Sequence, residues 1–444
     1  MSKSLAIHGG EKTVPNGMQK PWPPLTQEDI DAVIAVLKTG VLWGPMEEQV
    51  TGLQNDFAKY VGAKHALVVN SGTAALHACV CACGIGPGDE VITPAYSFWA
   101  TSQAVLAHNG IPVFVDIDPE TMNMDPKQIE AKITDRTKAL LPVHVHGLTA
   151  DMDAINAIAR KHKLKVIEDA AQAAGAKYKG KSAGILGDIA GFSLNGSKNL
   201  PAGEGGIVTT NDDDLMDRAR KMAMFGEKVI PKGLIRLYDA QIMGFNYRNN
   251  EMADALCRSI LKRFDRLQAD RAENCEYLNR ELDKIKGVKP PATPTECVHA
   301  WHLYKVRVYP EQLGITNVHV KRFRWGVMKA LQAEGVDLFE WHNMPVPAQK
   351  IFLNKDAYPK GCPWNCQHAA EKARNIKYNP FDYPVCVDMF DRSFCIKPIY
   401  PPNGRDLMER IVSAFHKVFD NLDAVVEFSK TIEFPTMPGE TRKI

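Results

Sequence analysis

The chain has 444 residues, of which 45% are hydrophobic and 24% are charged, a balance typical of globular proteins that bury several cores. Its 54 basic and 52 acidic side chains give a formal net charge of +2 without a long block of one sign, which argues against a nucleic-acid-binding or anionic-membrane protein. Residues 1–25 lack the apolar core of a signal peptide, and no later stretch holds the roughly 18 apolar residues that a spanning helix needs. We therefore expect a cytoplasmic protein of two or three domains.

The ten cysteines occur without a secretory signal, so we expect reduced thiols. Cys79, Cys81 and Cys83 alternate along a segment with helical spacing, where residues i and i+2 point in different directions and form a poor metal site. Cys362 and Cys366 lie in a loop, and no second pair at zinc-finger spacing accompanies them. We expect core packing for the first group and no metal.

Short apolar runs alternate with amphipathic stretches from about residue 64 to residue 210. This alternation predicts repeated strand-helix units, and hence a mostly parallel, buried sheet with helices on both faces. We expect strands in HALVVN, DEVITPA, IPVFVDI, KALLPVHVHG, LKVIEDAA, IAGFSL and GGIVTTND, and helices in TAALHACVCACG, FWATSQAVLAHNG, DPKQIEAKI and DMDAINAIARKHK.

The pattern changes in the second half of the chain. Residues 253–285 carry apolar side chains at helical spacing without proline or glycine, which predicts a long helix or a helix pair. Beyond about residue 290 the pattern is α+β, with a strand in HAWHLYKVRVY, a helix in FRWGVMKALQAEG and a closing helix in ERIVSAFHKVFDNLDAVVEF. We expect an N-terminal arm (1–25), a large domain (26–285) and a small domain (286–444) with an ordered, aromatic-rich insertion at about 355–384.

In open α/β sheets, ligands bind beyond the carboxyl ends of the strands, so we expect the site at the strand-to-helix turns. Residues 70–74 (NSGTA) let a helix N-terminus close on an anion, although an ordinary helix cap has the same residues. Glu168 and Asp169 end an apolar run, where a carboxylate can act on a ligand or cap the next helix. Lys198 precedes a glycine-rich turn at 203–206, which suits Schiff-base chemistry as well as a surface lysine.

Residues 175–182 (GAKYKGKS) match the GxxxxGK[ST] pattern of phosphate-binding P-loops. A P-loop passes directly from a strand into a helix, whereas AGILGD, with glycines at 184 and 187, follows here. The P-loop NTPase is therefore a distant alternative.

Several segments, taken in their order and spacing, resemble the DegT/DnrJ/EryC1/StrS family of sugar and cyclitol aminotransferases. The resemblance covers nearly the whole chain and rests on NSGTAALHA, GDEVITPAYSFWAT, VIEDAAQAAGA, FSLNGSKNLPAGEGG and GFNYRNNEMADA. It implies fold type I: a mostly parallel central sheet flanked by helices, with a smaller α+β C-terminal domain. It also implies pyridoxal 5'-phosphate as cofactor and a homodimer with shared active sites.

The resemblance carries functional roles over to individual residues. Lys198 takes the place of the lysine that holds the cofactor and, once displaced by substrate, serves as general base. Asp169 matches the acid that pairs with the pyridinium nitrogen, and Gln172 the residue that hydrogen-bonds the ring hydroxyl. The ring-stacking aromatic is matched by Phe98, the phosphate cup by Gly72, Thr73 and Ser193, and the residue that reaches the neighbouring subunit's phosphate by Asn246.

The sequence departs from the family pattern at Asn195, where many sugar aminotransferases have a histidine. The cyclitol and aminohydroxybenzoate branches also lack that histidine, and both the LAIHGG opening and the GCPWNC insertion resemble the inosose aminotransferases. The family's dehydratases replace the lysine, so Lys198 argues for amino transfer.

We therefore expect an aminotransferase that moves an amino group from L-glutamine or L-glutamate to a ketone of a cyclitol or sugar. An aminohydroxybenzoate-synthase-like enzyme, a nucleotide-sugar aminotransferase and a non-catalytic sensor remain alternatives; the lack of a basic cluster argues against a nucleotide diphosphate. Candidate substrate contacts, including two histidines that could equally be core residues, are Trp99, Asn195, Arg248, His302 and His342.

Overall fold

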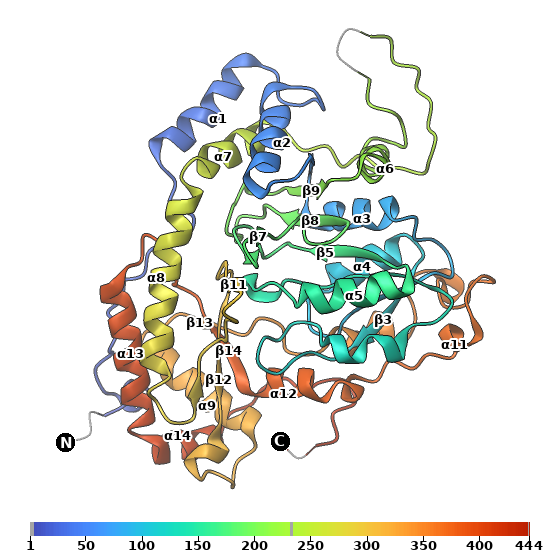
Figure 1. Cartoon of the computed structure of the whole chain (residues 1–444). Coiled ribbons are helices and arrows are strands. Elements are labelled where there is room, and N and C mark those ends of the chain that lie inside the picture. The colour runs from blue at the N-terminus through green and yellow to red at the C-terminus, as the bar shows by residue number, and fades with distance from the viewer. Residues whose placement is uncertain (1–3, 231–233, 443) are drawn as a thin grey trace.

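The computed structural model describes residues 4–230, 234–442 and 444, and a seven-stranded sheet forms its centre (Figure 1). The strands follow the order β1-β9-β8-β5-β4-β2-β3. Neighbouring strands from β8 to β3 pair in parallel, whereas β9 is antiparallel to both β1 and β8. The strands are β1 (His65–Val69), β2 (Glu90–Pro94), β3 (Ile111–Val115), β4 (Thr137–Leu140), β5 (Lys165–Asp169), β8 (Ile189–Ser193) and β9 (Gly206–Thr210).

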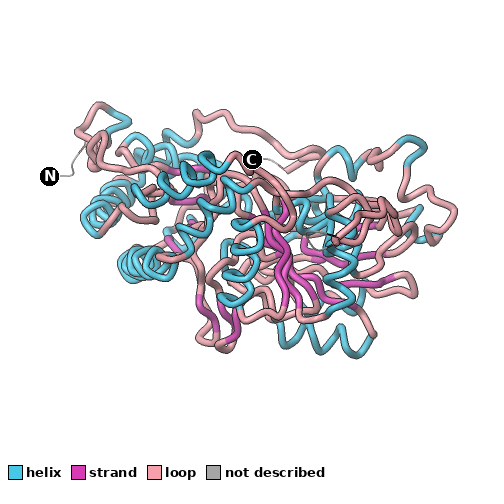
Figure 2. Tube along the Cα trace, turned by 90° about the horizontal axis from the view of Figure 1, so that it is seen from above, coloured by secondary structure: helices cyan, strands magenta, loops and turns pink. Residues whose placement is uncertain are grey.

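Helices cover both faces of this sheet, so the strands lie between layers of helices (Figure 2). Successive side chains of a strand point to opposite faces, and in β1 Leu67 and Val69 face one layer while Ala66 and Val68 face the other. Burial on both sides explains the nearly continuous apolar runs of the sequence. The first layer contains α3 (Gly72–Ala82), α4 (Ala100–Ala107) and α6 (Asp213–Ala223), and the second α2 (Glu48–Val61), α5 (Met152–His162) and α7 (Glu251–Leu261).

The junction between β1 and α3 lies at the carboxyl edge of the large sheet, where a ligand site is expected. The Ser71 hydroxyl caps α3 by accepting a hydrogen bond from the Ala74 N–H at 3.1 Å. Every residue from Ala74 to Ala82 is buried, so this helix is apolar on all sides rather than amphipathic. Cys79 and Cys81 lie in the core, as expected.

A second, antiparallel sheet lies beside the first, with the strand order β10-β12-β14-β13. Its core includes Leu5 and Val14, so the N-terminal segment packs against this sheet. Elsewhere, α1 (Gln27–Thr39) packs on α7. The second sheet contains β10 (Val288–Lys289), β12 (Tyr304–Val308), β13 (Leu338–Phe339) and β14 (Ser393–Ile396), and its helices are α8 (Phe264–Leu282), α9 (Val320–Ala333), α12 (Pro384–Arg392), α13 (Arg405–Phe419) and α14 (Leu422–Ser429).

The P-loop-like segment forms a hairpin. Its strands β6 (Lys177–Tyr178) and β7 (Lys181–Ser182) pair antiparallel, and β6 pairs on its other side with β11 (Cys297–Val298). No helix follows, so the backbone N–H groups are not gathered at a helix N-terminus as a P-loop requires. The P-loop alternative is therefore wrong.

Other predicted elements are shorter or more broken than the sequence suggests. The expected single closing helix is the pair α13 and α14, and the expected helix in DPKQIEAKI is a pair of 3₁₀ turns. The strand expected from His299 begins only at Tyr304, because the chain turns at Trp301, whose φ is 53°. Within the described residues, every helix is too short or too polar to cross a lipid bilayer. The 3₁₀ helices span Ala6–His8, Pro126–Gln128, Glu130–Lys132, Val145–Gly147, Pro310–Leu313, Val346–Ala348, Pro359–Gly361 and Pro380–Asp382.

Residues 355–384 pack against the edge of the large sheet that ends in β3. Trp364 is fully buried, and its indole N–H donates to the Tyr378 hydroxyl at 2.9 Å. The Tyr378 hydroxyl in turn donates to the Pro112 carbonyl at 2.8 Å. This aromatic core links a late segment of the chain to the first sheet. The short helix α11 (Glu371–Arg374) belongs to this segment, and the short helix α10 (Lys350–Leu353) directly precedes it.

Candidate active site

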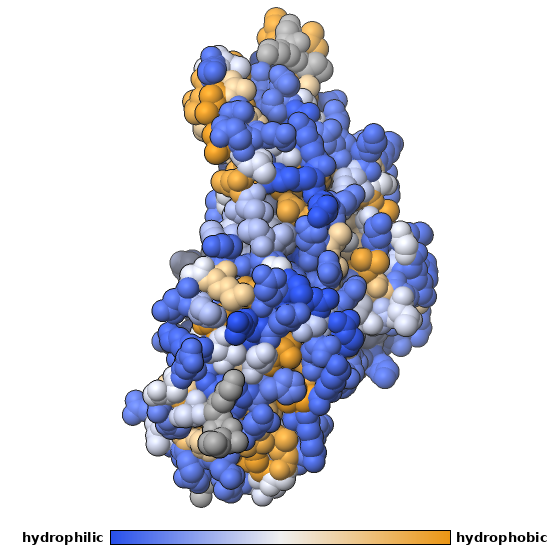
Figure 3. Space-filling view, turned by 90° about the vertical axis from the view of Figure 1, so that its left-hand side faces the viewer, coloured by the Kyte–Doolittle hydropathy of each residue, from blue (hydrophilic) through white to orange (hydrophobic). Residues whose placement is uncertain are grey.

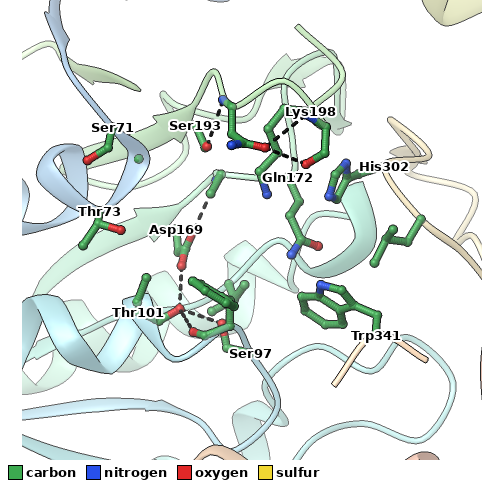
Figure 4. A pocket seen from close by; sticks show the side chains of 18 of the residues that line it. Ser71, Thr73, Ser97, Thr101, Asp169, Gln172, Ser193, Lys198, His302 and Trp341 are labelled. Atoms are coloured by element: carbon green, nitrogen blue, oxygen red, sulfur yellow. Dashed lines mark hydrogen bonds between the residues drawn. The ribbon is translucent and has the colours of Figure 1, made fainter. Parts of the chain in front are cut away.

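A pocket of about 700 Å³ opens between the carboxyl ends of the large sheet's strands and the small sheet (Figure 4). This is the place that the topology predicts for a ligand. The large sheet contributes residues that follow β1, β2, β4, β5 and β8, and the small sheet contributes residues of β13 and β14. The two sides of the pocket therefore come from different sheets.

Lys198 lies in the loop after β8 and lines the pocket with a buried amine. Burial lowers the pKa of Lys198 from its ordinary value of 10.5 to about 8, against the negative charge of Asp169, which raises it. The Trp22 indole N–H donates to the Lys198 carbonyl at 3.0 Å and fixes the backbone there. About a tenth of this amine is thus unprotonated at pH 7, far more than for a lysine with the ordinary pKa.

Asp169 ends β5 and directs its carboxylate into the pocket (Figure 4). Its Oδ2 accepts a hydrogen bond from the Thr101 hydroxyl at 2.6 Å, and its Oδ1 accepts one from the Ala171 N–H at 3.1 Å. Burial raises the pKa of Asp169, while these hydrogen bonds and the charge of Lys198 act in the opposite direction. The result is an oriented carboxylate facing a buried amine.

Glu168, the neighbouring acid, serves the core instead. Its side chain is fully buried and accepts hydrogen bonds from the N–H groups of Gly184, Leu186 and Gly187 at 2.7 to 2.8 Å. The His144 Nε2 lies 2.8 Å from the same carboxylate. The acidic pair found in the sequence therefore divides into one site residue and one structural residue.

The N-terminus of α3 forms a cradle on the opposite side of Asp169 from the small sheet (Figure 4). A Cβ on Gly72 would lie 2.6 Å from the Ser193 Cβ, so only glycine fits this close approach. Thr73 and Ser193 bring hydroxyl groups to the same wall. A helix N-terminus with small residues and hydroxyls is suited to a phosphate group.

Further predicted residues line the pocket around this centre. Gln172 is held by the His146 N–H, which donates to its Oε1 at 2.6 Å. Phe98 leaves 49% of its surface exposed and turns its ring toward the pocket. Asn195 donates to Glu204 at 2.7 Å, and its Oδ1 accepts from Ser197. His302 is half-buried and lines the pocket between these residues and the small sheet.

The remaining predicted residues do not line this pocket. Trp99 packs beside the aromatic core of the 355–384 segment. His342 faces Phe98 with ring centroids 5.5 Å apart. Asn246 and Arg248 lie on the connection between α6 and α7, where the Arg248 guanidinium lies 5.1 Å from each of two aromatic rings, those of Trp43 and Phe225. Among the described residues, no cluster of three metal-binding side chains occurs.

Comparison with known proteins decides the family. Residues 23–380 match the DegT/DnrJ/EryC1/StrS aminotransferase family, which is more than half of the chain. The chain belongs to this family. It is therefore an aminotransferase, and the family resemblance and fold class predicted from the sequence are confirmed.

Relatives and solved structures agree with this membership. The chain is 36% identical over 431 residues to L-glutamine:2-deoxy-scyllo-inosose aminotransferase of Streptomyces lividus, covering 94% of this chain and 98% of that protein. It is 42% identical over 289 residues to GDP-perosamine synthase of Caulobacter vibrioides, covering 65% and 74%. The solved structure of 3-amino-5-hydroxybenzoic acid synthase is 28% identical with a TM-score of 0.78, covering 91% and 99%.

Sequence reasoning missed much of this aminotransferase's pocket. Thr101 orients Asp169, and the hydroxyl residues Ser97 and Thr101, which flank the start of α4 and lie within hydrogen-bond distance of each other, are a weak signal that could have found it. Trp341 follows β13, and its indole packs against Tyr96 and His146 at centroid distances of 5.6 and 5.3 Å. The other pocket residues that no sequence pattern indicated are Leu303, Asp337, Phe339, Ile396, Lys397 and Tyr400.

Proposed function

We propose that this aminotransferase uses pyridoxal 5'-phosphate to move an amino group from L-glutamine or L-glutamate to a ketone of a cyclitol or sugar. The observation that carries the proposal is the buried amine of Lys198 facing the oriented carboxylate of Asp169 in one pocket. Family membership sets the reaction class, while the cofactor and substrates are the proposal's own content.

The pocket fits the cofactor in three respects. The α3 N-terminus with Gly72, Thr73 and Ser193 offers a cradle for the phosphate group. Asp169, held by Thr101, offers a carboxylate for the pyridinium nitrogen. Lys198 supplies an amine that is partly unprotonated near neutral pH, as attachment of an aldehyde requires.

When bound, pyridoxal phosphate supplies the electron sink that a carbon-bound proton needs in order to leave. The chain's own groups provide the rest of the chemistry. The Lys198 Nζ holds and returns the moving proton, because burial keeps its pKa near the working pH. The carboxylate of Asp169 is held in place by the Thr101 hydrogen bond, and residues of the small sheet form the other side of the pocket.

The acceptor class follows from the relatives and the pocket. The similar inosose aminotransferase is named for a keto-cyclitol, and the hydrogen-bonding side chains of the pocket, among them Asn195 and His302, suit a polyol ring. Because the chain is also similar to GDP-perosamine synthase, a nucleotide-sugar acceptor remains an alternative. The similarity to the 3-amino-5-hydroxybenzoic acid synthase structure likewise leaves an aminohydroxybenzoate-synthase-like role as an alternative. We also place the reaction in the cytoplasm, since all ten cysteines, which lie within the described ranges, are free thiols.

A homodimer is part of the proposal. On α1, Ile30, Ile34 and Leu37 form an exposed apolar stripe, 39% to 52% exposed, at helical spacing. Figure 3, which looks at this side of the molecule, shows apolar residues at its upper end. The connection between α6 and α7 protrudes beyond the large sheet with further exposed apolar side chains (Figure 1). A second copy would cover these surfaces and receive Asn246 at its own site.

The decisive experiment is a visible absorption spectrum of the purified protein with pyridoxal phosphate, repeated after addition of L-glutamine. We expect a bound-cofactor band in the wild type that L-glutamine shifts to the spectrum of the aminated cofactor. Lys198→Ala removes this response. Lys181→Ala, which alters the exposed lysine of the P-loop-like hairpin, is the matched control and leaves it unchanged.

Two outcomes would contradict the proposal. A wild-type protein without a lysine-dependent band refutes the cofactor assignment. A band that L-glutamine and L-glutamate both leave unchanged refutes the donor assignment.

A further inference from the structure

A buried cation without an acidic partner lies behind the pocket. Arg271 of α8 is only 2% exposed, and its guanidinium lies 4.6 Å from the Trp22 ring and 5.8 Å from the Tyr400 ring. Within the described residues it forms no ion pair with a carboxylate, and its Nε has no hydrogen-bond partner. Because burying an unpaired charge is costly, this arginine calls for an explanation beyond packing.

Arg271 fixes the orientation of the amides beside it. A guanidinium only donates, so Gln268 must present its Oε1 to the Arg271 Nη1 at 2.8 Å. The Gln268 Nε2 then faces the Ala300 carbonyl at 3.2 Å. The next amide, that of Asn199, places its Nδ2 at 2.5 Å from the Ala300 carbonyl and 3.4 Å from the Gln268 Oε1. Because the Ala300 carbonyl and the Gln268 Oε1 both accept, the Asn199 side chain must point its Nδ2 toward them.

The orientation of Asn199 determines the tautomer of His302. The Asn199 Oδ1 lies 3.3 Å from the His302 Nδ1, and an amide oxygen only accepts. The Nδ1 of His302 therefore carries the ring proton. The Nε2 is left as an acceptor toward the pocket, since the one hydrogen bond that the His302 ring makes among the described residues runs through Nδ1.

His302 also stays neutral. Burial, together with the nearby positive charge of Lys198 and Arg271, holds the pKa of His302 well below its ordinary value. Such a ring is a poor base, so it orients a ligand rather than removing a proton. His302 and Trp341 occupy the side of the pocket across from Thr73 and Asp169 (Figure 4). The Nε2 thus belongs to the recognition side of the site.

We infer that His302 selects keto substrates that carry a hydroxyl group on a carbon beside the reacting ketone. The inference rests on the proposed function and specifies which ketones accept the amino group. Arg271, Gln268 and Asn199 are positioning residues that present the His302 Nε2 as an acceptor. A substrate hydroxyl donates to that nitrogen, whereas a ring with a methylene at the same place covers the acceptor and leaves it without a partner.

The hydroxyl is placed beside the ketone because His302 lies next to Lys198 in the pocket: its Nδ1 is 3.3 Å from the side chain of Asn199, the residue that follows Lys198 in the chain. The reacting carbon must lie within reach of the Lys198 amine. A group that touches His302 therefore belongs to a neighbouring carbon of the same ring rather than to a distant substituent.

The test compares three rings as acceptors: scyllo-inosose and the two mirror-image forms of 2-deoxy-scyllo-inosose. The fully hydroxylated ring has a mirror plane through its ketone, so each deoxy form lacks the hydroxyl on one flank only. We expect one mirror image to react like the parent and the other to lose about 10- to 100-fold in kcat/KM.

Variants assign this discrimination to His302. His302→Phe keeps the ring volume without its nitrogens and should bring the two mirror images within about threefold of each other. His302→Gln, whose side-chain oxygen can replace the Nε2 lone pair, should restore the preference. His299→Asn changes a buried histidine that stacks on Trp301 outside the pocket and serves as the matched control.

A second readout needs neither cofactor nor turnover. In protein labelled with ¹⁵N-histidine, the signals lost in His302→Phe should report a neutral ring with the proton on Nδ1. Arg271→Met should mix the two tautomers, and Gln268→Leu tests the same point if the first variant does not fold. A proton on Nε2 in the wild type overturns the inference.

The outcomes also separate this inference from the proposed function. If L-glutamine gives no spectral change in the wild type, the proposed function fails and the inference fails with it. If that change occurs but the three rings react at equal rates, zero included, the inference alone fails. Discrimination that persists in His302→Phe likewise overturns the role of His302.

Discussion

The two sides of the pocket differ in how they are built. On the large-sheet side, Gly72, Asp169 and Lys198 lie in turns that directly follow β1, β5 and β8 or at a strand end. On the small-sheet side, His302 and Trp341 come from irregular segments around β12 and β13. The first side carries the groups proposed to react, while the second carries the rings of His302 and Trp341. The repeated strand-to-helix turns thus position the reactive residues, whereas irregular segments of the small sheet position the residues proposed to recognise the substrate.

The largest effect should come from the reactive side. We expect Asp169→Asn to lower kcat by about 100- to 1,000-fold, because the amide keeps the shape but removes the charge that Thr101 orients. Steady-state kinetics with saturating cofactor measure this. A loss below about fivefold would mean that the carboxylate has no electrostatic role and would erase the contrast between the two sides.

The neighbouring acid gives the matched test. Glu168→Gln should lower the free energy of unfolding by about 2 to 4 kcal/mol, because the amide cannot accept from all of the N–H groups around it and brings an extra donor among them. Denaturant titration measures this, and folded protein should keep most of its kcat. Loss of activity at unchanged stability would assign Glu168 to the site instead.

The pH dependence of cofactor capture examines Lys198 directly. The unprotonated amine binds the aldehyde, so the rate should rise about tenfold per pH unit below about 8 and level off above it, in line with the lowered pKa of Lys198. Stopped-flow absorbance with cofactor-free protein follows the reaction. A rate that continues to rise toward the ordinary lysine value of 10.5 would contradict the burial argument.

The smallest effect should appear on the recognition side. Trp341→Ala should lower kcat/KM for the keto acceptor by about threefold to tenfold, because a ring face is lost while every reactive group remains. The L-glutamine half-reaction, followed by absorbance, should change less. Trp325→Ala removes an indole that stacks on Phe434 outside the pocket and is the control.

This contrast explains what the sequence could predict. Asp169 and Lys198 follow apolar runs and stand beside small residues, so local patterns and a family resemblance both indicate them. Glu168 has the same local pattern, and only the tertiary structure shows that it binds the backbone of residues 184–187. Trp341 has no such pattern, because its place depends on how the small sheet packs against the large one.

The fold shows the same division. The parallel sheet was predictable because both of its faces are buried and its strands are apolar throughout. The helix breaks were less visible, since α13 and α14 both carry apolar side chains across their junction at 420–421. The hairpin at 175–182 matched a motif pattern by its residue types, while its partner β11 lies more than a hundred residues away.

Because Glu168 and Asp169 are adjacent, the register in which β5 pairs with its neighbours decides which of the two acids faces the pocket. Side chains alternate along β5, so a slip of one residue would carry the structural acid into the pocket and the reactive acid into the core. Main-chain hydrogen bonds to β4 on one side and β8 on the other prevent that slip. The electrostatics of the reaction are therefore maintained by peptide groups that never approach the substrate, and a change that loosens either neighbouring strand can abolish activity while every pocket residue is intact.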